Sequence, residues 1–353
     1  MIEFKALHNL DLVNDSIVAK QILPDFAAFT NDYLTFARSN GTTKKYTVVD
    51  NTTQVINCLT QIIQLSIFAD VEDDALRNQL AALSLSIANR LLRAEKDAQD
   101  RIVHMNKFIK KGSLIQAIVR DGVVPDSYLY IIAKVEHSEW FDGESLRKSF
   151  GFPTEKKNVW KSAVIPVYIS EGDCSIGSIR VYTDNDAKYW AEAFLEVKEE
   201  KSDETNTKAA FEAIDRELRL ELKKDHPRDY YVIRNTVIQT MKTEQQLNYP
   251  EYVDWLVGNY TPYDTSVDTA KLKSKLLSLP EKKKFDTQFK TTPKAITARQ
   301  KIKFEPIEGV ALNLDGAIED FAQVIVAGID ENDKRILKVR CADEKTYRAF
   351  GGK

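Results

Sequence analysis

The feature of the sequence that most limits the fold is a series of short apolar runs between Gly112 and Tyr182. Each run is rich in Val, Ile and Tyr and is bounded by Gly, Pro, Asp or Ser, which is typical of strands and their turns. Four strands are predicted, over residues 114–120, 128–136, 162–169 and 178–183. The second is almost unbroken in its apolar character, so we expect it to be central and buried on both faces.

Two helical patterns precede these strands, after a first strand predicted over residues 2–12. Residues 51–68 place six apolar side chains on one helical face, and residues 73–111 repeat Leu, Ile and Ala at helical intervals until Gly112 stops the pattern. The longer helix is interpreted as a core helix lying across the sheet, with a coiled-coil dimer seam as the alternative. Residues 184–197 then predict a capped helix with an aromatic face.

Length and composition indicate two domains. The chain has 353 residues, about twice the usual length of a domain, and one elaborated domain is the alternative. Residues 196–208 are rich in charged residues, Ser, Thr and Asn, which predicts a charged linker or exposed loop at residues 198–208. The N-terminal domain then covers residues 1–197, with its central sheet at 112–183, and the C-terminal domain covers residues 209–353.

The C-terminal domain is predicted to be helical over residues 209–280 and to end in a small antiparallel sheet over residues 296–350. Pro280 ends the helical pattern, and four short apolar runs follow between turn residues. Residues 330–333 are typical of a hairpin loop, and a short helix is expected at residues 315–321. The predicted fold class is α+β, with long helices on a mixed sheet followed by this helical region and small sheet.

Composition excludes several broad classes of protein. With 43% hydrophobic and 29% charged residues the chain can bury a core, so wholesale disorder is not expected. The three cysteines are far apart, which fits a reducing compartment rather than a disulfide framework. The N-terminus has no signal-peptide core, and the longest apolar stretch, residues 55–69, is shorter than the roughly 20 residues that cross a bilayer. A soluble, cytoplasmic protein with no membrane contact is expected.

No motif of catalysis or cofactor binding occurs. The sequence contains no GxxxxGK[ST] phosphate loop, no GxGxxG, no HExxH and no GxSxG, and its four histidines are dispersed. We therefore expect no cofactor and no enzymatic activity.

One alternative is a metal-dependent nuclease that uses Asp121, Lys134 and Glu136. Carboxylates and a lysine on a strand can hold a divalent metal and activate water. The order here, Lys-x-Glu, reverses the usual nuclease order. Lys134 and Glu136 lie two residues apart and so share one face of a strand, where they could simply form an ion pair.

The strongest signal for a partner is a run of basic residues. Between Lys271 and Lys303 eleven residues are basic and two are acidic, a net charge of +9 in a chain whose formal net charge is −3. The basic residues are Lys271, Lys273, Lys275, Lys282, Lys283, Lys284, Lys290, Lys294, Arg299, Lys301 and Lys303. Phe285 and Phe289 are interleaved, and two prolines are expected to keep the run partly extended.

Such a run can neutralise phosphates and release counterions, a mode of binding that is independent of sequence and sensitive to salt. We therefore predict that it binds double-stranded DNA. The alternatives are a solvated surface and an adaptor whose basic run meets an acidic protein. A smaller basic set, at Lys148, Lys156, Lys157 and Lys161, is interpreted as surface.

Five segments carry a resemblance to a known family. They are RLLRAE at 90–95, KGSLIQAIV at 111–119, YLYIIAKVEHSEWFD at 128–142, GFPTEKK at 151–157 and IRVYTDNDAKYWAEAFL at 179–195. In these segments the chain resembles the bacterial nucleoid-associated proteins of the 37-kilodalton type, and the helical middle and strand-bearing end fit that layout.

The resemblance implies a cytoplasmic protein of the nucleoid that binds double-stranded DNA without strong sequence preference. No catalytic residue carries over from it. A homodimer through the helix at residues 75–111 and contact with chromosome-associated proteins are further expectations.

Overall fold

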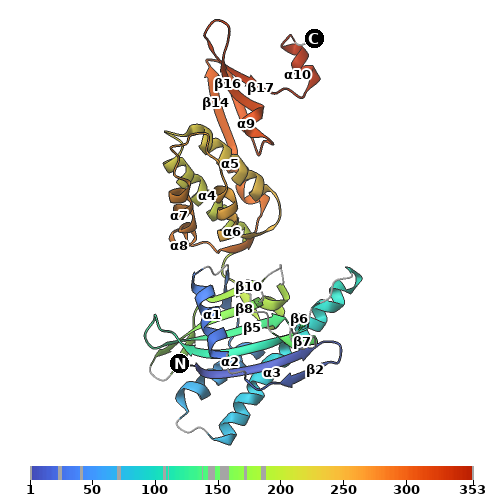
Figure 1. Cartoon of the computed structure of the whole chain (residues 1–353). Coiled ribbons are helices and arrows are strands. Elements are labelled where there is room, and N and C mark those ends of the chain that lie inside the picture. Colours follow the sequence, from blue (N-terminus) through green and yellow to red (C-terminus); the bar gives the residue numbers. More distant parts are fainter. Residues whose placement is uncertain are drawn as a thin grey trace. The chain divides into compact units, whose positions relative to one another are not determined.

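The structure is a computed structural model (Figure 1). It describes residues 2–22, 26–39, 43–69, 73–105, 109, 111–136, 138–141, 148–151, 159–170, 173–183 and 188–351. The chain divides into two compact units, the first formed by Met1–Lys201 with Asp286–Gln288 and the second by Ser202–Phe285 with Phe289–Lys353.

A nine-stranded sheet forms the centre of the first unit, in the order β11-β3-β10-β8-β5-β4-β1-β2, with β9 paired to β8. Its strands are β1 (Ile2–Asp11), β2 (Ser16–Ala19), β3 (Lys44–Val48), β4 (Gly112–Arg120), β5 (Ser127–Glu136), β8 (Val159–Ser170), β9 (Asp173–Ile176), β10 (Ile179–Thr183) and β11 (Val197–Glu199). A separate hairpin joins β6 (Ser138–Phe141) to β7 (Lys148–Gly151). The five strands predicted from the sequence are confirmed, and β5 is central.

Every neighbouring pair in this sheet is antiparallel, so the prediction of a mixed sheet is wrong. The physical reason lies in the connections. A tight turn can join antiparallel neighbours, whereas parallel neighbours need a long crossover. Here β4 reaches β5 through the short turn at residues 121–126, and β8 reaches β9 through two residues.

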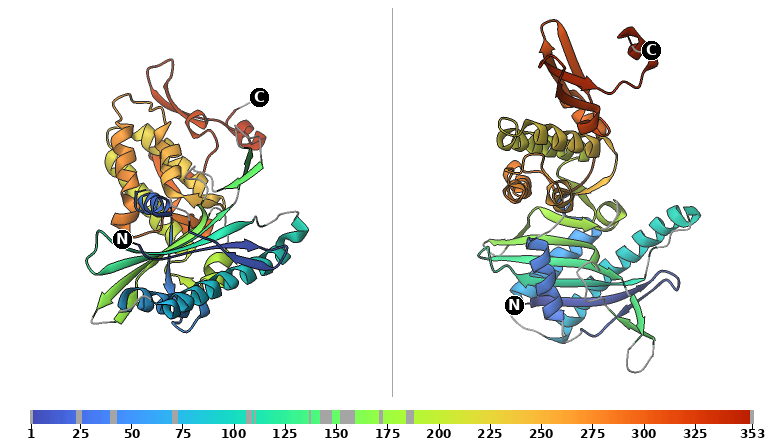
Figure 2. Two further views of the ribbon diagram at one scale, coloured as in Figure 1. Left: turned by 60° about the horizontal axis from the view of Figure 1, so that its bottom comes forward. Right: turned by 45° about the horizontal axis from the view of Figure 1, so that its top comes forward.

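Two long helices cover one face of the sheet, α2 (Gln54–Phe68) and α3 (Asp74–Ile102), as Figure 2 shows. Their apolar side chains form one core with Leu114 and Ile118 of β4 and Tyr130 and Ile132 of β5. The opposite face carries α1 (Phe26–Ser39), whose Tyr33 and Leu34 contact the alternate side chains of the same strands. Both faces of β5 are therefore buried, as predicted.

The apolar stripe of α3 packs against the core of the first unit. Ile87, Ala88, Leu91 and Leu92 are buried in the shared core, and Leu83 packs against it. This result confirms the interpretation of α3 as a core helix across the sheet. The helix ends at Ile102, nine residues before the predicted end, and a 3-10 turn over Val103–Met105 follows.

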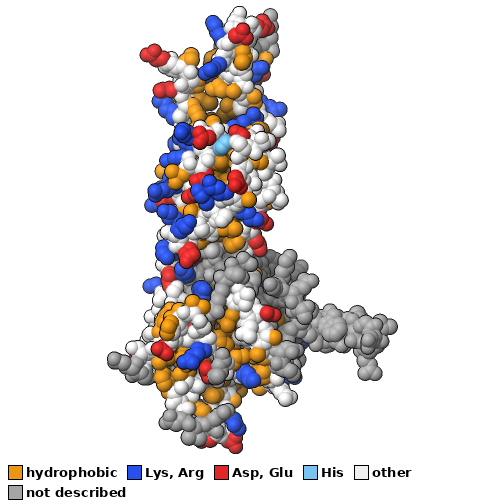
Figure 3. Space-filling view, turned by 60° about the vertical axis from the view of Figure 1, so that its left-hand side comes forward, with side chains coloured by type: hydrophobic (Ala, Val, Ile, Leu, Met, Phe, Trp, Pro, Cys, Tyr) orange, Lys and Arg blue, Asp and Glu red, His pale blue; other side chains and the backbone are white. Residues whose placement is uncertain are grey.

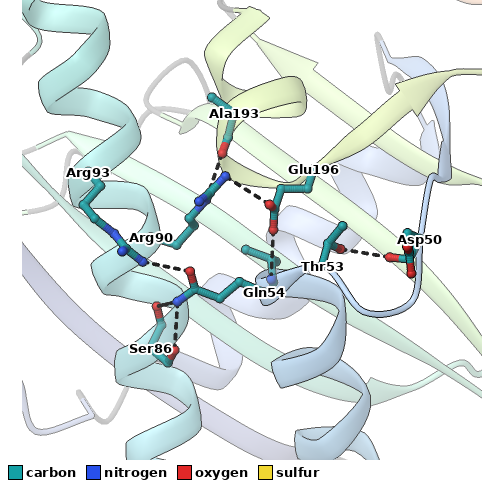
Figure 4. A network of polar contacts seen from close by, with 9 residues as sticks. Asp50, Thr53, Gln54, Ser86, Arg90, Arg93, Ala193 and Glu196 are labelled. Carbon is teal, nitrogen blue, oxygen red and sulfur yellow. Dashed lines mark hydrogen bonds and ion pairs between the residues drawn. The ribbon is translucent and has the colours of Figure 1, made fainter.

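A polar network ties α2 and α3 to the segment before β11 (Figure 4). The Arg90 guanidinium donates to Glu196 Oε1 at 3.0 Å and to the carbonyl oxygen of Ala193 at 3.0 Å. Glu196 Oε2 accepts from the backbone N–H of Val55, in the first turn of α2, at 3.3 Å. A carboxylate there satisfies a helix N–H that has no partner within the helix. Further hydrogen bonds join Gln54 to Ser86 and Arg93.

The aromatic helix expected at residues 184–197 is present but shorter. It covers residues 188–194, most of it as the π-helix Trp190–Phe194, whose Trp190 and Phe194 are buried in the core; β11 follows it, and residues 184–187 lie outside the described ranges. The predicted linker at residues 198–208 instead contains the start of α4 (Asp203–Glu221). Ser202 caps this helix by accepting from Thr205 N at 3.2 Å, and its acidic first turn suits the helix dipole. The polar residues therefore mark the start of a helix, and the boundary between the two units, after Lys201, falls within the predicted segment.

The second unit packs helices around a core that includes Phe211, Ile214, Val237, Tyr249 and Phe289. Its elements are α4, α5 (Pro227–Lys242), β12 (Gln246–Asn248), α6 (Tyr249–Val253), the π-helix Asp254–Gly258, α7 (Thr269–Leu277), α8 (Leu279–Lys283), β13 (Gln288–Lys290) and the 3-10 helix Pro293–Arg299.

The last part of the chain forms two separate hairpins rather than the single small sheet predicted. The first pairs β14 (Lys301–Ile307) with β15 (Val310–Asp315), and the second pairs β16 (Ile325–Ile329) with β17 (Arg335–Val339). The short helices α9 (Phe321–Val324) and α10 (Glu344–Ala349) flank the second hairpin. The turn residues specified each hairpin, but they carry no information about pairing between hairpins. Within the described ranges, no helix combines the length and apolar character that a membrane crossing requires.

Candidate nucleic-acid interface

The basic run is folded onto the second unit instead of being extended. Its residues lie on α7, on and just after α8, on β13, in the 3-10 helix and on β14. The two interleaved phenylalanines are core residues, with Phe285 3% and Phe289 0% exposed. Leu272, Leu276 and Leu279 are also buried, so apolar side chains at helical spacing hold the run against the core. Neither phenylalanine is available to stack on a base.

The side chains of several lysines in the run are nevertheless exposed to solvent. Lys271, Lys301 and Lys303 have side chains more than 60% exposed, and Lys294 is 73% exposed. Figure 3 shows Lys and Arg side chains gathered along one side of the second unit, with Asp and Glu side chains among them. The run thus forms a charged surface with both signs present.

Acidic residues from outside the run neutralise much of its charge. At least eight of the eleven cations have an acidic partner: Lys271 and Lys275 meet Glu221, Lys273 meets Asp254, Lys290 meets Glu244, Lys294 meets Glu204, Arg299 meets Glu212, Lys301 meets Asp315 and Lys303 meets Glu305. Hydrogen bonding to Glu221 raises the pKa of Lys275. A window of sequence could not include these partners, because three of the carboxylates, Glu204, Glu212 and Glu221, belong to α4.

Three consecutive lysines, Lys282, Lys283 and Lys284, lie at the end of α8. We call them the α8 lysines; all three are exposed, and they end α8 with Lys284 in the left-handed conformation at φ 58°. Lys282 and Lys283 have no ion pair with any residue that the structure describes. These two ammonium groups are the part of the run most open to a phosphate.

Of the smaller basic set, the structure describes the side chain of Lys161 alone. The Lys161 side chain is 7% exposed, and its ammonium lies 5.8 Å from the centroid of the Tyr189 ring. Lys156, Lys157 and the side chain of Lys148 lie outside the described residues.

Two of the three residues of the nuclease alternative, Asp121 and Lys134, are not brought together. Asp121 begins the turn after β4, where its carboxylate accepts from Val123 N at 3.0 Å. The register pairs Arg120 with Tyr128 at one end of the ladder and Leu114 with Lys134 towards the other. Asp121 and Lys134 are therefore roughly 24 Å apart along the strand, at 3.4 Å per residue. The side chain of Glu136 lies outside the described residues.

Lys134 instead makes a buried ion pair that the sequence did not indicate. Its ammonium lies 2.5 Å from Glu95 Oε1, and both side chains are 0% exposed. The Tyr189 hydroxyl donates to the same oxygen at 3.3 Å, whereas Glu95 Oε2 has no hydrogen-bond partner among the described residues. The pair ties α3 to β5. Because Glu95 and Lys134 are 39 residues apart, no local pattern could have predicted it.

A groove in the second unit offers a different surface. Its volume is about 560 Å³, and it is lined by Gln239, Thr240, Thr243, Gln245, Gln246, Leu247, Asn248, Glu251, Tyr252 and Trp255. Trp255 is 58% exposed and stacks on Tyr252, whose pKa is raised by burial. The lining contains no Lys or Arg, so the groove is unsuited to phosphate. No set of His, Cys, Asp and Glu able to hold a metal occurs within the described ranges.

Comparisons with known proteins found no family model, no curated protein and no solved structure that matches this chain.

Proposed function

We propose that the chain is a non-catalytic protein of the cytoplasm and the nucleoid that binds double-stranded DNA with little sequence preference. The observation that carries the proposal is the pair of exposed ammonium groups on Lys282 and Lys283, which have no acidic partner among the described residues. The resemblance to the nucleoid-associated family supports the same proposal. Homodimerisation and contact with chromosome-associated proteins stay predictions.

The ion pairs of the neighbouring cations reduce the positive charge of this surface but leave it able to bind a phosphate. Exposed ion pairs contribute only about 0–1 kcal/mol each, so a phosphate can replace a carboxylate at modest cost. The carboxylates nevertheless remain nearby and repel the duplex. We therefore expect DNA to contact the α8 lysines first and to gain less from the paired cations, such as Lys275.

Counterion release predicts how strongly DNA binding depends on salt concentration. Each neutralised phosphate lowers the slope of log Kobs against log[salt] by about 0.9. Three phosphate contacts, one from each of the α8 lysines, give a slope of about −2.7. Contacts from Lys294 and Lys301, the most exposed of the paired lysines, would steepen it further.

The experiment is a titration of a fluorescent duplex with the full chain at several salt concentrations. It compares the wild type with a variant carrying Lys282→Glu, Lys283→Glu and Lys284→Glu. A matched control makes the same change in net charge at three exposed lysines of the first unit, Lys20, Lys188 and Lys198. We expect the control to retain binding. We expect the test variant to bind more weakly, with a slope of log Kobs against log[salt] that is less negative by about 2.7.

Two results would overturn the proposal. Equal loss in both variants would mean that only net charge matters and that the α8 lysines are not the interface. Absence of binding by the wild type at low salt would favour the adaptor alternative, in which the basic surface meets an acidic protein.

A further inference from the structure

The hairpin of β16 and β17 has an apolar face that nothing in the described chain covers. We call this hairpin the C-terminal ribbon, residues 325–339. The register places Ile325 opposite Val339 and Ala327 opposite Leu337, so these side chains share one face with Ile329. Ile329 is 67%, Val339 50% and Leu337 47% exposed. Neither strand of the ribbon contributes a residue to the cores of the chain.

A two-stranded ribbon with an exposed apolar face is not expected to be stable by itself. A two-stranded hairpin alone is marginally stable in water, and three strands or a covering element are needed for independent stability. In the described structure β16 and β17 pair only with each other, so each also has an open edge. An open, apolar edge invites pairing with another chain.

The backbone of β17 shows what its open edge offers. Arg340 N donates to Val324 O at 2.8 Å, and Asp330 N donates to Lys334 O at 2.9 Å. Because these inward bonds recur every second residue, the N–H and C=O groups of the intervening residues Arg335, Leu337 and Val339 point to the open edge. The side chains of Leu337 and Val339 lie on the apolar face, so backbone pairing there would bring apolar neighbours beside them.

The charged residues on and beside β17 indicate which kind of peptide segment could bind to its open edge. Arg335, Lys338 and Arg340 are exposed and have no ion pair with a described residue. Lys338 lies on the face opposite Leu337 and Val339, because successive residues of a strand alternate between faces. A strand pairing with β17 would thus meet Leu337 and Val339 on one face and Lys338 and Arg340 on the other, with Arg335 at the end of the apolar face. The open N–H and C=O groups of β17 can pair with another peptide backbone and not with a phosphate backbone, so a protein is favoured over DNA.

We propose that the C-terminal ribbon binds an extended segment of another protein in which apolar and acidic residues alternate. The segment adds as a third strand to the open edge of β17. Its apolar side chains lie beside Leu337 and Val339, and its carboxylates lie beside Lys338 and Arg340. This mode of recognition takes affinity from backbone hydrogen bonds and specificity from alternate side chains.

The test uses the full chain and a labelled eight-residue peptide of alternating Val and Glu, with fluorescence anisotropy as the readout. One control peptide has the same composition in two blocks, four Val followed by four Glu, and another alternates Val with Lys. We expect saturable binding of the alternating Val/Glu peptide and at least tenfold weaker binding of both controls.

Two variants test the two faces separately. Lys338→Glu with Arg340→Glu should weaken the Val/Glu peptide at least tenfold and reverse the preference, so that the Val/Lys peptide binds better. Leu337→Asp with Val339→Asp should abolish binding of every peptide. The matched control, Ile307→Asp with Val310→Asp, alters equally exposed side chains on the other hairpin and should leave binding unchanged. All these side chains are exposed, so the variants should fold.

Three outcomes would overturn the proposal. The first is no binding of the Val/Glu peptide, or equal binding of the blocked peptide. The second is self-association by sedimentation that Leu337→Asp with Val339→Asp abolishes, which would make a second copy of this chain the occupant. The third is loss of duplex binding in Lys338→Glu with Arg340→Glu, which would assign the ribbon to DNA.

Discussion

β5 and β17 are both strands in which apolar residues flank a lysine, but their environments are opposite. β5 has strands on both sides and helices on both faces, whereas β17 has one neighbour and no cover in the described structure. Lys134 of β5 is fully buried against Glu95, whereas Lys338 of β17 is exposed. A local pattern is enough to specify a strand, but the elements packed around it determine what its side chains do.

The charge of the basic run likewise depends on the residues that surround it in the folded structure. In the sequence its charge is +9, but in space α4 supplies carboxylates to Lys271, Lys275, Lys294 and Arg299. Lys282 and Lys283 keep an open charge because no acidic residue of the described structure pairs with either of them. The electrostatic character of a segment is therefore set by its neighbours in space.

The largest effect is expected from removing one partner of the buried pair. Glu95→Ala removes the carboxylate that lies against the buried Lys134 ammonium, which costs about 3–5 kcal/mol of unfolding free energy. Urea unfolding followed by circular dichroism measures the loss. The double variant Glu95→Leu with Lys134→Met should recover most of it, since no charge remains to be desolvated. A loss under about 1 kcal/mol in Glu95→Ala would show that Lys134 is solvated or neutral in the folded chain.

The next effect compares the two strands directly. Ile132→Ala removes a fully buried side chain from β5 and should cost about 2–5 kcal/mol through lost burial and a residual cavity. Leu337→Ala on β17 removes a side chain that is 47% exposed and should change the unfolding free energy by about 0.5 kcal/mol or less. The two variants are measured in the same urea series. Similar losses in both would mean that the ribbon is covered in solution, for example by a second copy of the chain.

The smallest effect concerns His8, which lies on β1 and is 3% exposed. Burial lowers the pKa of its imidazole below the usual value of 6.5. The folded state therefore binds the proton less well than the unfolded state, and stability should fall as the pH drops below about 6.5. His8→Gln should remove this component of the pH dependence, as measured by unfolding free energies at a series of pH values. An unchanged profile would show that His8 is not the group responsible.

Much of the first unit could be predicted because its signals are local. The apolar run of β5 and the turns at its ends specify a strand, and the helical spacing of Ile87 and Leu91 specifies a helix with one buried face. The predictions failed where distant residues decide. Ser202 marks a helix start only if a core exists for Phe211 to join, and the basic run becomes helical because Leu272 and Leu276 pack into that same core.

The sequence by itself determined that this is an α+β chain with a central apolar strand, a long core helix and a strongly basic segment near residue 280. These properties follow from periodicity and composition, which act over a few residues. Only the tertiary structure decided which charges are neutralised, as with Glu95 and Lys134, and which apolar strand stays uncovered, as with β17. Burial and ion pairing depend on residues far apart along the chain, and those contacts exist only once the chain has folded.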